Sequence, residues 1–410
     1  MKYRLKKHNS RLKGTITLES SKSESNRALI INALADGDHS NIHNLSNARD
    51  TQTMLKLLSQ KDGMYDVKDA GTTMRFLTAY LAIKGKDATI TGTERMKNRP
   101  IGPLVDALRS IGAKIEYLGK DGYPPLKIHG IEGQLSNKIS IPGNISSQYI
   151  SALLMIAPCL PHGLTLELTT EIFSRPYIEM TLSLMESFGV KASWKENSIS
   201  IAPQSYQPVN YTIEGDWSGA SYWYSFVSLA PEESSLVLPT LRKNSTQGDI
   251  AIANIMAKMG VSSVFENNGV LLQKVEAAKK SLSLDFRDCP DLAQTVMVSA
   301  AVNGISLEMT GLDSLKIKET DRILAMQNEL AKLGAKLTED VDLWRLIPST
   351  NLQEGIEVDV YEDHRMAMAF APLCQLMDVT INDPDVVQKS YPGFWDEVRE
   401  LGVHIETVSS

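Results

Sequence analysis

Two kinds of apolar segment alternate along the chain. In one kind, apolar residues recur at helical spacing and the segment ends at a glycine, as Leu104, Leu108 and Ile111 do before Gly112. Glycine is preferred just past a helix end, and this spacing indicates an amphipathic helix. After the glycine the apolar positions alternate, as in a half-buried strand. The pattern recurs about every 70 residues, at Gly112, Gly189, Gly260, Gly334 and Gly402.

The second kind of segment is almost entirely apolar and opens with polar residues, which is typical of a buried, capped helix. These openings lie at residues 25–27, 71–73, 146–148, 218–221, 290–292 and 363–365. A degenerate copy of the amphipathic pattern lies at residues 51–59. With it, the chain contains six amphipathic segments and six buried ones. The period is too long for common solenoids. The pattern therefore predicts six α/β modules, with a break between the third and fourth at residues 211–216.

Composition and charge narrow the class of protein. The 410 residues are 42% hydrophobic and 22% charged, which is typical of a globular protein with two domains or more. The net charge of −7 disfavours non-specific binding to nucleic acid. No apolar run reaches the length of a membrane span, and the basic N-terminus lacks the apolar core of a signal peptide. We therefore expect a cytoplasmic protein.

Cysteine and histidine usage excludes two further kinds of site. The chain has three cysteines, Cys159, Cys289 and Cys374, and no Cys-x-x-Cys spacing. An odd number in a long chain argues against a disulfide framework. The seven histidines form no ligand cluster. We therefore expect no structural metal.

Within this acidic chain, four short motifs combine Lys or Arg with hydroxyls or carboxylates. They occupy residues 21–27, 95–100, 318–322 and 363–365. Three of them lie where an apolar helix begins. Arginine forks match phosphate and carboxylate geometry, and helix N-termini attract anions. If the four segments meet in the fold, they form a site for a small substrate with several negative charges.

Each motif also has a simpler interpretation. Residues 21–27 and 69–73 could be plain capped helix starts, and residues 95–100 either a solvated loop or a lid over anions. Lys318 and Arg322 are expected on one helix face, where a surface ion-pair cluster is the simple alternative. Asp291, before a helix that is apolar over residues 293–302, is either a cap or a general base.

Taken in order, the motifs resemble those of 5-enolpyruvylshikimate-3-phosphate synthases. Residues 21–27 match the SKS-x-SNR motif, and further matches follow in the family's order at residues 70–72, 95–102, 146–148, 318–322 and 363–366. The resemblance implies an α/β fold of two domains, each of three βαβαββ units (an inside-out α/β barrel). It places one domain at residues 20–213 and the other at 1–19 with 214–410. It implies an active site in the interdomain cleft and domain closure on substrate.

The resemblance also implies a reaction and its residues. The family moves the enolpyruvyl group of phosphoenolpyruvate to the 5-hydroxyl of shikimate 3-phosphate and releases phosphate, without metal or organic cofactor. It implies that Asp291 is the base on the hydroxyl, and that Glu319 and Lys22 are candidates for the other proton transfers. The residues implied for shikimate 3-phosphate are Lys22, Ser23, Arg27, Ser146, Ser147, Gln148, Ser174, Tyr177, Asp291, Ser314 and Lys318. Those implied for phosphoenolpyruvate are Lys22, Gly71, Arg99, Gln148, Arg322, His364, Arg365 and Lys389.

Two positions depart from the family pattern, because Asp69 and Ser314 stand where asparagine is usual. Asp69 adds a negative charge beside an expected anion site, so a cation such as Arg99 should compensate it.

Three alternatives remain open. One is the related UDP-N-acetylglucosamine enolpyruvyl transferase, whose mobile loop carries a cysteine that residues 93–100 lack. Another is a ring-like clamp or scaffold without activity. The third is a homologue that binds anions without turnover. We expect a monomer whose partners are the two substrates, with no nucleic acid and no membrane.

Overall fold

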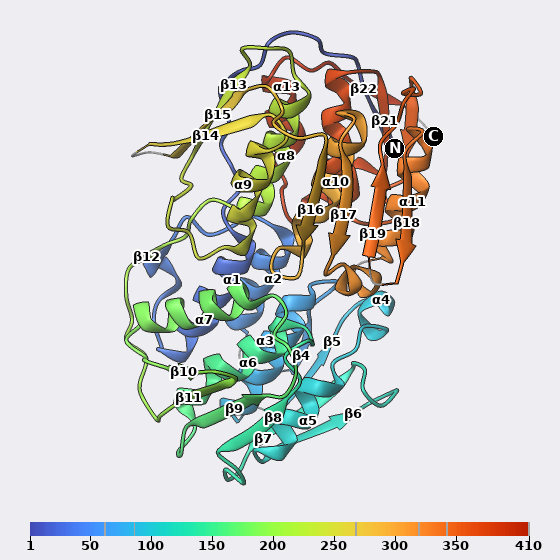
Figure 1. Cartoon of the computed structure of the whole chain (residues 1–410). Coiled ribbons are helices and arrows are strands. Elements are labelled where there is room, and N and C mark those ends of the chain that lie inside the picture. The colour runs from blue at the N-terminus through green and yellow to red at the C-terminus, as the bar shows by residue number, and fades with distance from the viewer. Residues whose placement is uncertain (61–62, 86, 267–268, 319, 342, 409–410) are drawn as a thin grey trace. The chain divides into compact units, whose positions relative to one another are not determined.

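The computed structural model describes residues 1–60, 63–85, 87–266, 269–318, 320–341 and 343–408, and the chain divides into two compact units. Unit 1 comprises Met1–Glu19 with Glu214–Ser410, and unit 2 comprises Ser20–Ile213. Each unit has its own apolar core. The repeated strands and helices of Figure 1 confirm the predicted α/β class.

Two four-stranded sheets in the described part of unit 2 share one topology, βαβαββ. The first two strands are parallel, and the hairpin that follows joins the second strand in antiparallel pairing. The first sheet and its helices are β4 (Gly63–Asp66), α3 (Gly71–Ile83), β5 (Ala88–Thr91), α5 (Gly102–Ser110), β6 (Ala113–Tyr117) and β7 (Leu126–Ile131). The second set is β8 (Lys138–Ile141), α6 (Ser147–Ile156), β9 (Leu164–Leu168), α7 (Arg175–Ser187), β10 (Ser193–Lys195) and β11 (Ser198–Ile201).

The ends of unit 2 meet in a shorter third group. Its elements are α1 (Lys22–Leu34), β3 (Ile42–His43), α2 (Arg49–Leu58) and β12 (Tyr211–Thr212). β12 runs parallel to β3, with Tyr211 opposite Ile42. The short helices η1 (His39–Asn41), α4 (Glu94–Lys97) and η2 (Ala157–Cys159) complete the unit's described helices. The last strand therefore closes the unit onto its first helices.

Unit 1 repeats the βαβαββ topology in three four-stranded sheets of described residues. The first set is β2 (Lys13–Thr15), α8 (Trp217–Leu229), β13 (Ser235–Pro239), α9 (Ala251–Ala257), β14 (Val261–Glu266) and β15 (Gly269–Lys274). The second is β16 (Ser281–Asp285), α10 (Ala293–Val302), β17 (Ser306–Thr310), α11 (Arg322–Lys332), β18 (Lys336–Asp340) and β19 (Leu343–Ile347). The third is β20 (Ile356–Val358), α12 (His364–Phe370), β21 (Val379–Asn382), α13 (Phe394–Glu400), β22 (Ile405–Val408) and β1 (Lys2–Leu5).

The N-terminal strand completes the third sheet of unit 1. β1 lies between β21 and β22 and pairs antiparallel with both. Five 3₁₀ segments of described residues connect the elements of this unit: η3 (Gly248–Ile250), η4 (Pro290–Leu292), η5 (Asp313–Ile317), η6 (Ala371–Gln375) and η7 (Pro384–Lys389).

Each module contains one buried and one amphipathic helix, as the sequence predicts. Every residue of α8 is buried, and α3, α6, α10 and α12 are buried along most of their length. The five predicted helix-ending glycines all have positive φ, from 82° at Gly334 to 110° at Gly112. Polar and charged side chains at the first turns of these buried helices therefore lie next to the apolar core.

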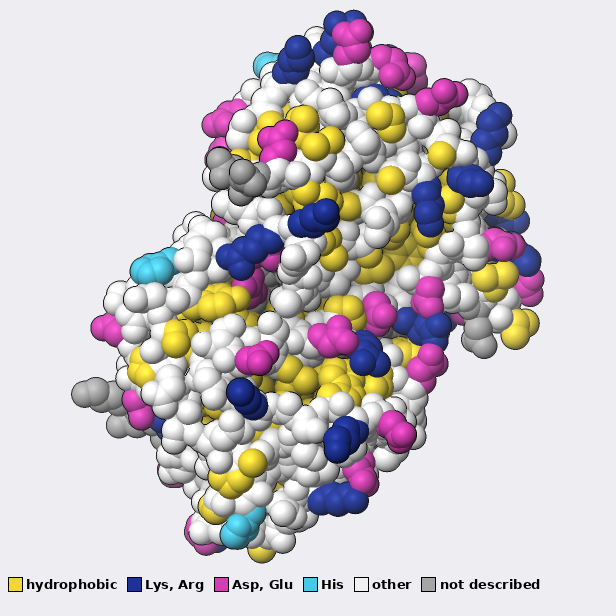
Figure 2. All heavy atoms as spheres, turned by 60° about the vertical axis from the view of Figure 1, so that its left-hand side comes forward, with side chains coloured by type: hydrophobic (Ala, Val, Ile, Leu, Met, Phe, Trp, Pro, Cys, Tyr) yellow, Lys and Arg dark blue, Asp and Glu magenta, His cyan; other side chains and the backbone are white. Residues whose placement is uncertain are grey.

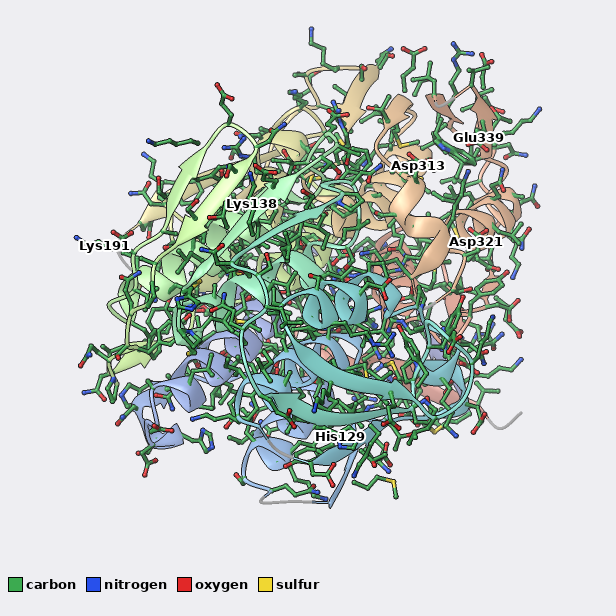
Figure 3. All side chains as sticks on the ribbon, turned by 90° about the horizontal axis from the view of Figure 1, so that it is seen from below. His129, Lys138, Lys191, Asp313, Asp321 and Glu339 are labelled. Atoms are coloured by element: carbon green, nitrogen blue, oxygen red, sulfur yellow. The ribbon has the colours of Figure 1, made fainter. Side chains whose placement is uncertain are left out.

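One sequence prediction about a helix is wrong. Lys318 and Arg322 do not share a helix, because η5 ends at Ile317 and α11 begins at Arg322. Asp321 is the N-cap of α11, and its Oδ1 accepts a hydrogen bond from the Leu324 amide at 3.0 Å. Asp313 and Asp321, labelled in Figure 3, mark the start of η5 and the cap of α11. Glu319 lies outside the described residues.

Charges of both signs are present on the face that Figure 2 shows. On the face in Figure 2, Lys and Arg side chains alternate with Asp and Glu, and apolar side chains lie between them. No helix among the described residues is long and apolar enough to cross a bilayer.

Candidate active site

Lys22 opens α1 and is anchored from α2. Its Nζ lies 3.3 Å from Oδ2 of Asp50, a carboxylate whose side chain is almost fully buried. Ser21 caps the helix by accepting a hydrogen bond from the Glu24 amide at 3.3 Å. A cation at a helix N-terminus is placed against the helix dipole. The arrangement raises the local positive potential, which suits an anionic ligand.

Arg27, one turn further along α1, is buried among hydroxyls and aromatic rings. Its Nε donates to Thr181 Oγ1 at 2.7 Å, and Nη2 donates to Ser151 Oγ at 3.1 Å. Its Nη1 donates to the Ser23 carbonyl at 2.9 Å. The guanidinium also lies 5.8 Å from the centre of the Tyr177 ring. Burial lowers the pKa of Arg27 to about 10, so it stays charged at neutral pH.

Two arginines converge where α3 begins. A Cβ atom at Gly71 would lie 2.7 Å from Nη1 of Arg75 and 2.7 Å from Nη1 of Arg99, so glycine is what lets both guanidinium groups approach. Arg75 donates to the Gly71 carbonyl at 2.9 Å and to the Pro100 carbonyl at 3.3 Å. Arg75 is not among the site residues that the sequence predicts. Its signal was a single arginine within an otherwise apolar buried helix.

Asp69, just before this helix, is compensated by a cation that the sequence analysis did not name. Both carboxylate oxygens of Asp69 accept from Nη2 of Arg49, at 3.1 and 2.9 Å. The pair is partly exposed. Arg49 thus reduces the negative charge that Asp69 brings to the start of α3.

The neutral hydrogen-bonding residues of unit 2 open α6 and α7. Gln148 Nε2 donates to Thr72 Oγ1 at 3.0 Å, which joins the start of α6 to the first turn of α3. Ser146 is the N-cap of α6, and Ser147 is its first residue. Ser174 precedes α7 with a φ of 55° and does not cap it through its side chain. A serine held in this uncommon conformation is typical of a functional position.

Asp291 is held by two arginines in unit 1. It lies in η4, ahead of α10, and its Oδ1 accepts from Arg322 Nη1 at 3.0 Å. Its Oδ2 accepts from Arg365 Nη2 at 2.8 Å. The Asp291 side chain is 21% exposed, whereas both arginines are buried. Its partial exposure leaves this carboxylate accessible to a substrate hydroxyl, and the two arginines fix its orientation.

The same arginines are anchored from behind. Arg322 Nε donates to Asp363 Oδ2 at 2.6 Å, and Asp363 also caps α12 through the Arg365 amide at 2.9 Å. Arg365 Nη1 donates to the Tyr222 hydroxyl at 3.3 Å. Burial raises the pKa of Tyr222, so the phenol remains a neutral partner. These contacts unite α8, η4, α11 and α12, from three different modules.

The remaining described residues that were predicted in unit 1 lie in or beside η5, α12 and η7. Ser314 lies in η5, and Lys318 lies between η5 and α11. Lys389, at the end of η7, is buried. His364 Nδ1 is 3.7 Å from Asp363 Oδ1, beyond hydrogen-bonding distance. Among the described residues, no group of three or more His, Cys, Asp or Glu is placed to hold a metal ion.

Comparison with known proteins identifies one family. The family model of EPSP synthase (3-phosphoshikimate 1-carboxyvinyltransferase) matches residues 6–62 and 59–398. A 3-phosphoshikimate 1-carboxyvinyltransferase of Bacteroides fragilis is 48% identical over 401 residues, 97% of each chain. One from Laribacter hongkongensis is 37% identical over 95% of this chain and 97% of its own.

Solved structures agree on the fold. An EPSP synthase from Acinetobacter baumannii aligns over 100% of both chains with a TM-score of 0.82 at 22% identity. At this identity the likeness concerns the fold, which is the two-domain architecture of repeated α/β units.

Proposed function

Because the chain belongs to the EPSP synthase (3-phosphoshikimate 1-carboxyvinyltransferase) family, we propose that Asp291 is the base of its reaction. The protein transfers the enolpyruvyl group of phosphoenolpyruvate to the 5-hydroxyl of shikimate 3-phosphate and releases phosphate. The observation that carries the assignment is the double ion pair of Asp291, at 3.0 Å to Arg322 and 2.8 Å to Arg365. It fixes the orientation of the carboxylate beside cations that suit an anionic substrate.

The proposed sequence of bonds follows addition and elimination. In the addition stage, Asp291 removes the proton of the 5-hydroxyl while the hydroxyl oxygen attacks C2 of phosphoenolpyruvate. The methylene carbon of phosphoenolpyruvate gains a proton in the same stage. In elimination the new methyl group loses a proton and the C2–phosphate bond breaks. Lys22 and Glu319 are the candidates for proton transfer at the methylene carbon and the leaving phosphate. For Lys22, its place at the start of α1, 3.3 Å from Asp50, supports the proposal.

The proposed binding residues form two overlapping sets. For phosphoenolpyruvate we propose Lys22, Gly71, Arg99, Gln148, Arg322, His364, Arg365 and Lys389, and add Arg75 because it meets Arg99 at Gly71. For shikimate 3-phosphate we propose Lys22, Ser23, Arg27, Ser146, Ser147, Gln148, Ser174, Tyr177, Asp291, Ser314 and Lys318. Arginine forks suit the phosphate and carboxylate groups, whereas hydroxyls and amides suit the ring hydroxyls.

The decisive experiment measures phosphate release from phosphoenolpyruvate with and without shikimate 3-phosphate. Asp291→Asn keeps the shape of the side chain but cannot accept the proton, so kcat should fall by about 100-fold or more. Glu339→Gln is the matched control, because Glu339 is exposed and pairs with Lys316 at the surface. Full activity of Asp291→Asn would remove the proposed base. Release with UDP-N-acetylglucosamine as the acceptor would instead support the aminosugar reaction.

We further propose a cytoplasmic monomer that does not use nucleic acid as a partner. The three cysteines are free thiols in the structure, which is usual in a reducing compartment. Sedimentation equilibrium at several protein concentrations tests the monomer, and a constant mass of one chain is expected.

A further inference from the structure

Asp249 is a buried carboxyl group that the reaction scheme leaves without a role. It lies in η3 just before α9 and is 3% exposed. Its Oδ2 accepts a hydrogen bond from Ser218 Oγ in the first turn of α8. Its Oδ1 is buried and has no hydrogen-bond partner among the residues that the structure describes. A buried carboxylate oxygen without a donor is costly, whereas a neutral carboxyl group is much less so.

A short chain of contacts joins Asp249 to the proposed base. Ser218 Oγ also accepts from Arg365 Nη2 at 3.4 Å, and the same nitrogen donates to Asp291 Oδ2 at 2.8 Å. Arg322 divides its donors between Asp291 and Asp363. Three carboxyl groups therefore face two guanidinium groups. Asp291 and Asp363 contact a guanidinium group directly and Asp249 does not, so Asp249 is the carboxyl group that keeps its proton most readily.

The charged groups around Asp249 act on its pKa in both directions. Asp216, the N-cap of α8, and Asp291 of η4 contribute negative charge, while Arg365 of α12 opposes them. Burial and the Asp291 charge raise the pKa of Asp249 to about 7. Cys289, just before η4, is also nearby, and burial raises the pKa of its thiol so that it remains neutral.

We propose that Asp249 is a positioning residue that works in its neutral form and holds Arg365 against Asp291 through Ser218. The role rests on the proposed function of Asp291. When Asp249 is neutral, the positive charge of Arg365 interacts with Asp291 and with the anionic substrate. When Asp249 loses its proton, a second carboxylate competes for that charge, and the substrate meets one more negative charge beside its site.

The proposal predicts a change in how activity depends on pH. In the wild type, kcat/KM for phosphoenolpyruvate should fall as pH rises through about 7, because Asp249 then ionises. Asp249→Asn is permanently neutral and has nearly the same shape. The ratio of its kcat/KM to that of the wild type should rise about threefold or more between about pH 6 and pH 8.5. A structural role alone would change activity by the same factor at every pH.

Glu397→Gln is the matched control. Burial also raises the pKa of Glu397 to about 7, but this carboxyl faces the Thr17 backbone, Asp396 and Glu400 rather than Asp291. The ratio of kcat/KM for Glu397→Gln to that of the wild type should not change with pH. A constant ratio for Asp249→Asn, or a folded Asp249→Asn protein that is inactive at every pH, overturns the proposal.

Ser218→Ala tests the link independently, including the case in which Asp249→Asn fails to fold. Removing the hydroxyl should raise KM for phosphoenolpyruvate about threefold or more, because Arg365 loses its support. An unchanged KM in a folded Ser218→Ala protein overturns the proposal. Thermal denaturation checks folding of each variant. Failure of the proposed function is a different result, namely no release of phosphate by the wild type at any pH.

Discussion

Arg322 is the residue on which the cluster of unit 1 depends, because its fork contacts Asp291 and Asp363 at once. Lysine keeps the charge but cannot reproduce a planar fork with several fixed donors. We therefore expect Arg322→Lys to lower kcat/KM by about 100-fold, which corresponds to roughly 2–3 kcal/mol. Steady-state phosphate release measures the change.

Arg345 provides the control for this substitution. It contacts Glu308 at 3.3 Å and Asp340 at 2.7 Å, and all three side chains are about half exposed. Exposed pairs contribute little to stability, so Arg345→Lys should leave activity unchanged. Equal losses in both variants would show that the effect at Arg322 is general rather than local.

The pair of Arg49 and Asp69 makes a second prediction for single residues. Without Arg49, Asp69 places an uncompensated charge next to the start of α3, where phosphoenolpyruvate is proposed to bind. Since the pair is partly exposed, Arg49→Ala should raise KM for phosphoenolpyruvate only about two- to fivefold. Asp69→Asn in the same chain should restore KM, and the rise should shrink in high salt. No rescue by Asp69→Asn contradicts the compensation.

The candidate site was only partly accessible from sequence at this scale. Arg322 and Arg365 stand in motifs that resemble a family, the resemblance implies Asp291 by its position, and the structure brings these three together. Asp50, Ser218 and Asp249 were missed because each stands outside the cationic motifs and acts through a partner distant in sequence. These contacts depend on how helices of different modules pack together, and local sequence patterns do not show that packing.

At the scale of the element, the helix-ending glycines carry a stability prediction. Gly260 has a φ of 98°, and a Cβ there would lie 2.9 Å from the Val275 carbonyl oxygen. Gly260→Ala should therefore lower the free energy of unfolding by about 1–3 kcal/mol. Gly133→Ala is the control, because Gly133 has no positive φ and no atom lies within 4 Å of a Cβ placed there. Denaturant titration should show little change for it.

The type of each element followed from periodicity, but their ends depended on capping. The apolar run at residues 293–302 coincides with α10. The joint helix of Lys318 and Arg322 was wrong because Asp321 caps α11 and ends any earlier helix there. Asp321 is of a residue type that favours the N-cap, and this signal indicates the start of α11 better than the spacing of Lys318 and Arg322 does.

At the scale of the whole molecule, pairing between distant strands could not be read from local patterns. β1 pairs with β21 and β22, near the opposite end of the chain. The helix-ending glycines and the buried helices recur because every module repeats the same order of helices and strands. The strands that complete a sheet from the other terminus carry no such signal in their own residues.

The pH dependence of stability belongs to the same scale, because opposing groups contribute to it. Hydrogen bonds from the Lys7 amide and Lys6 lower the pKa of Asp378, so its contribution is lost as pH falls. Burial raises the pKa values of Asp249 and Glu397 to about 7. Between about pH 4 and pH 7 the folded chain therefore binds more protons at these two groups than the unfolded chain. The free energy of unfolding consequently falls as pH rises through this range.

The combined variant Asp249→Asn with Glu397→Gln removes both of these groups. It should raise the midpoint of thermal unfolding relative to the wild type by several degrees at about pH 8, and leave it almost unchanged near pH 4, where both carboxyls are already neutral. Asp378→Asn should do the reverse, with its largest loss at neutral pH and little effect in acid. Calorimetric scans across this range measure all three proteins. An equal shift of the combined variant at both pH values would mean that the gain does not come from ionisation of Asp249 and Glu397, which contradicts the prediction.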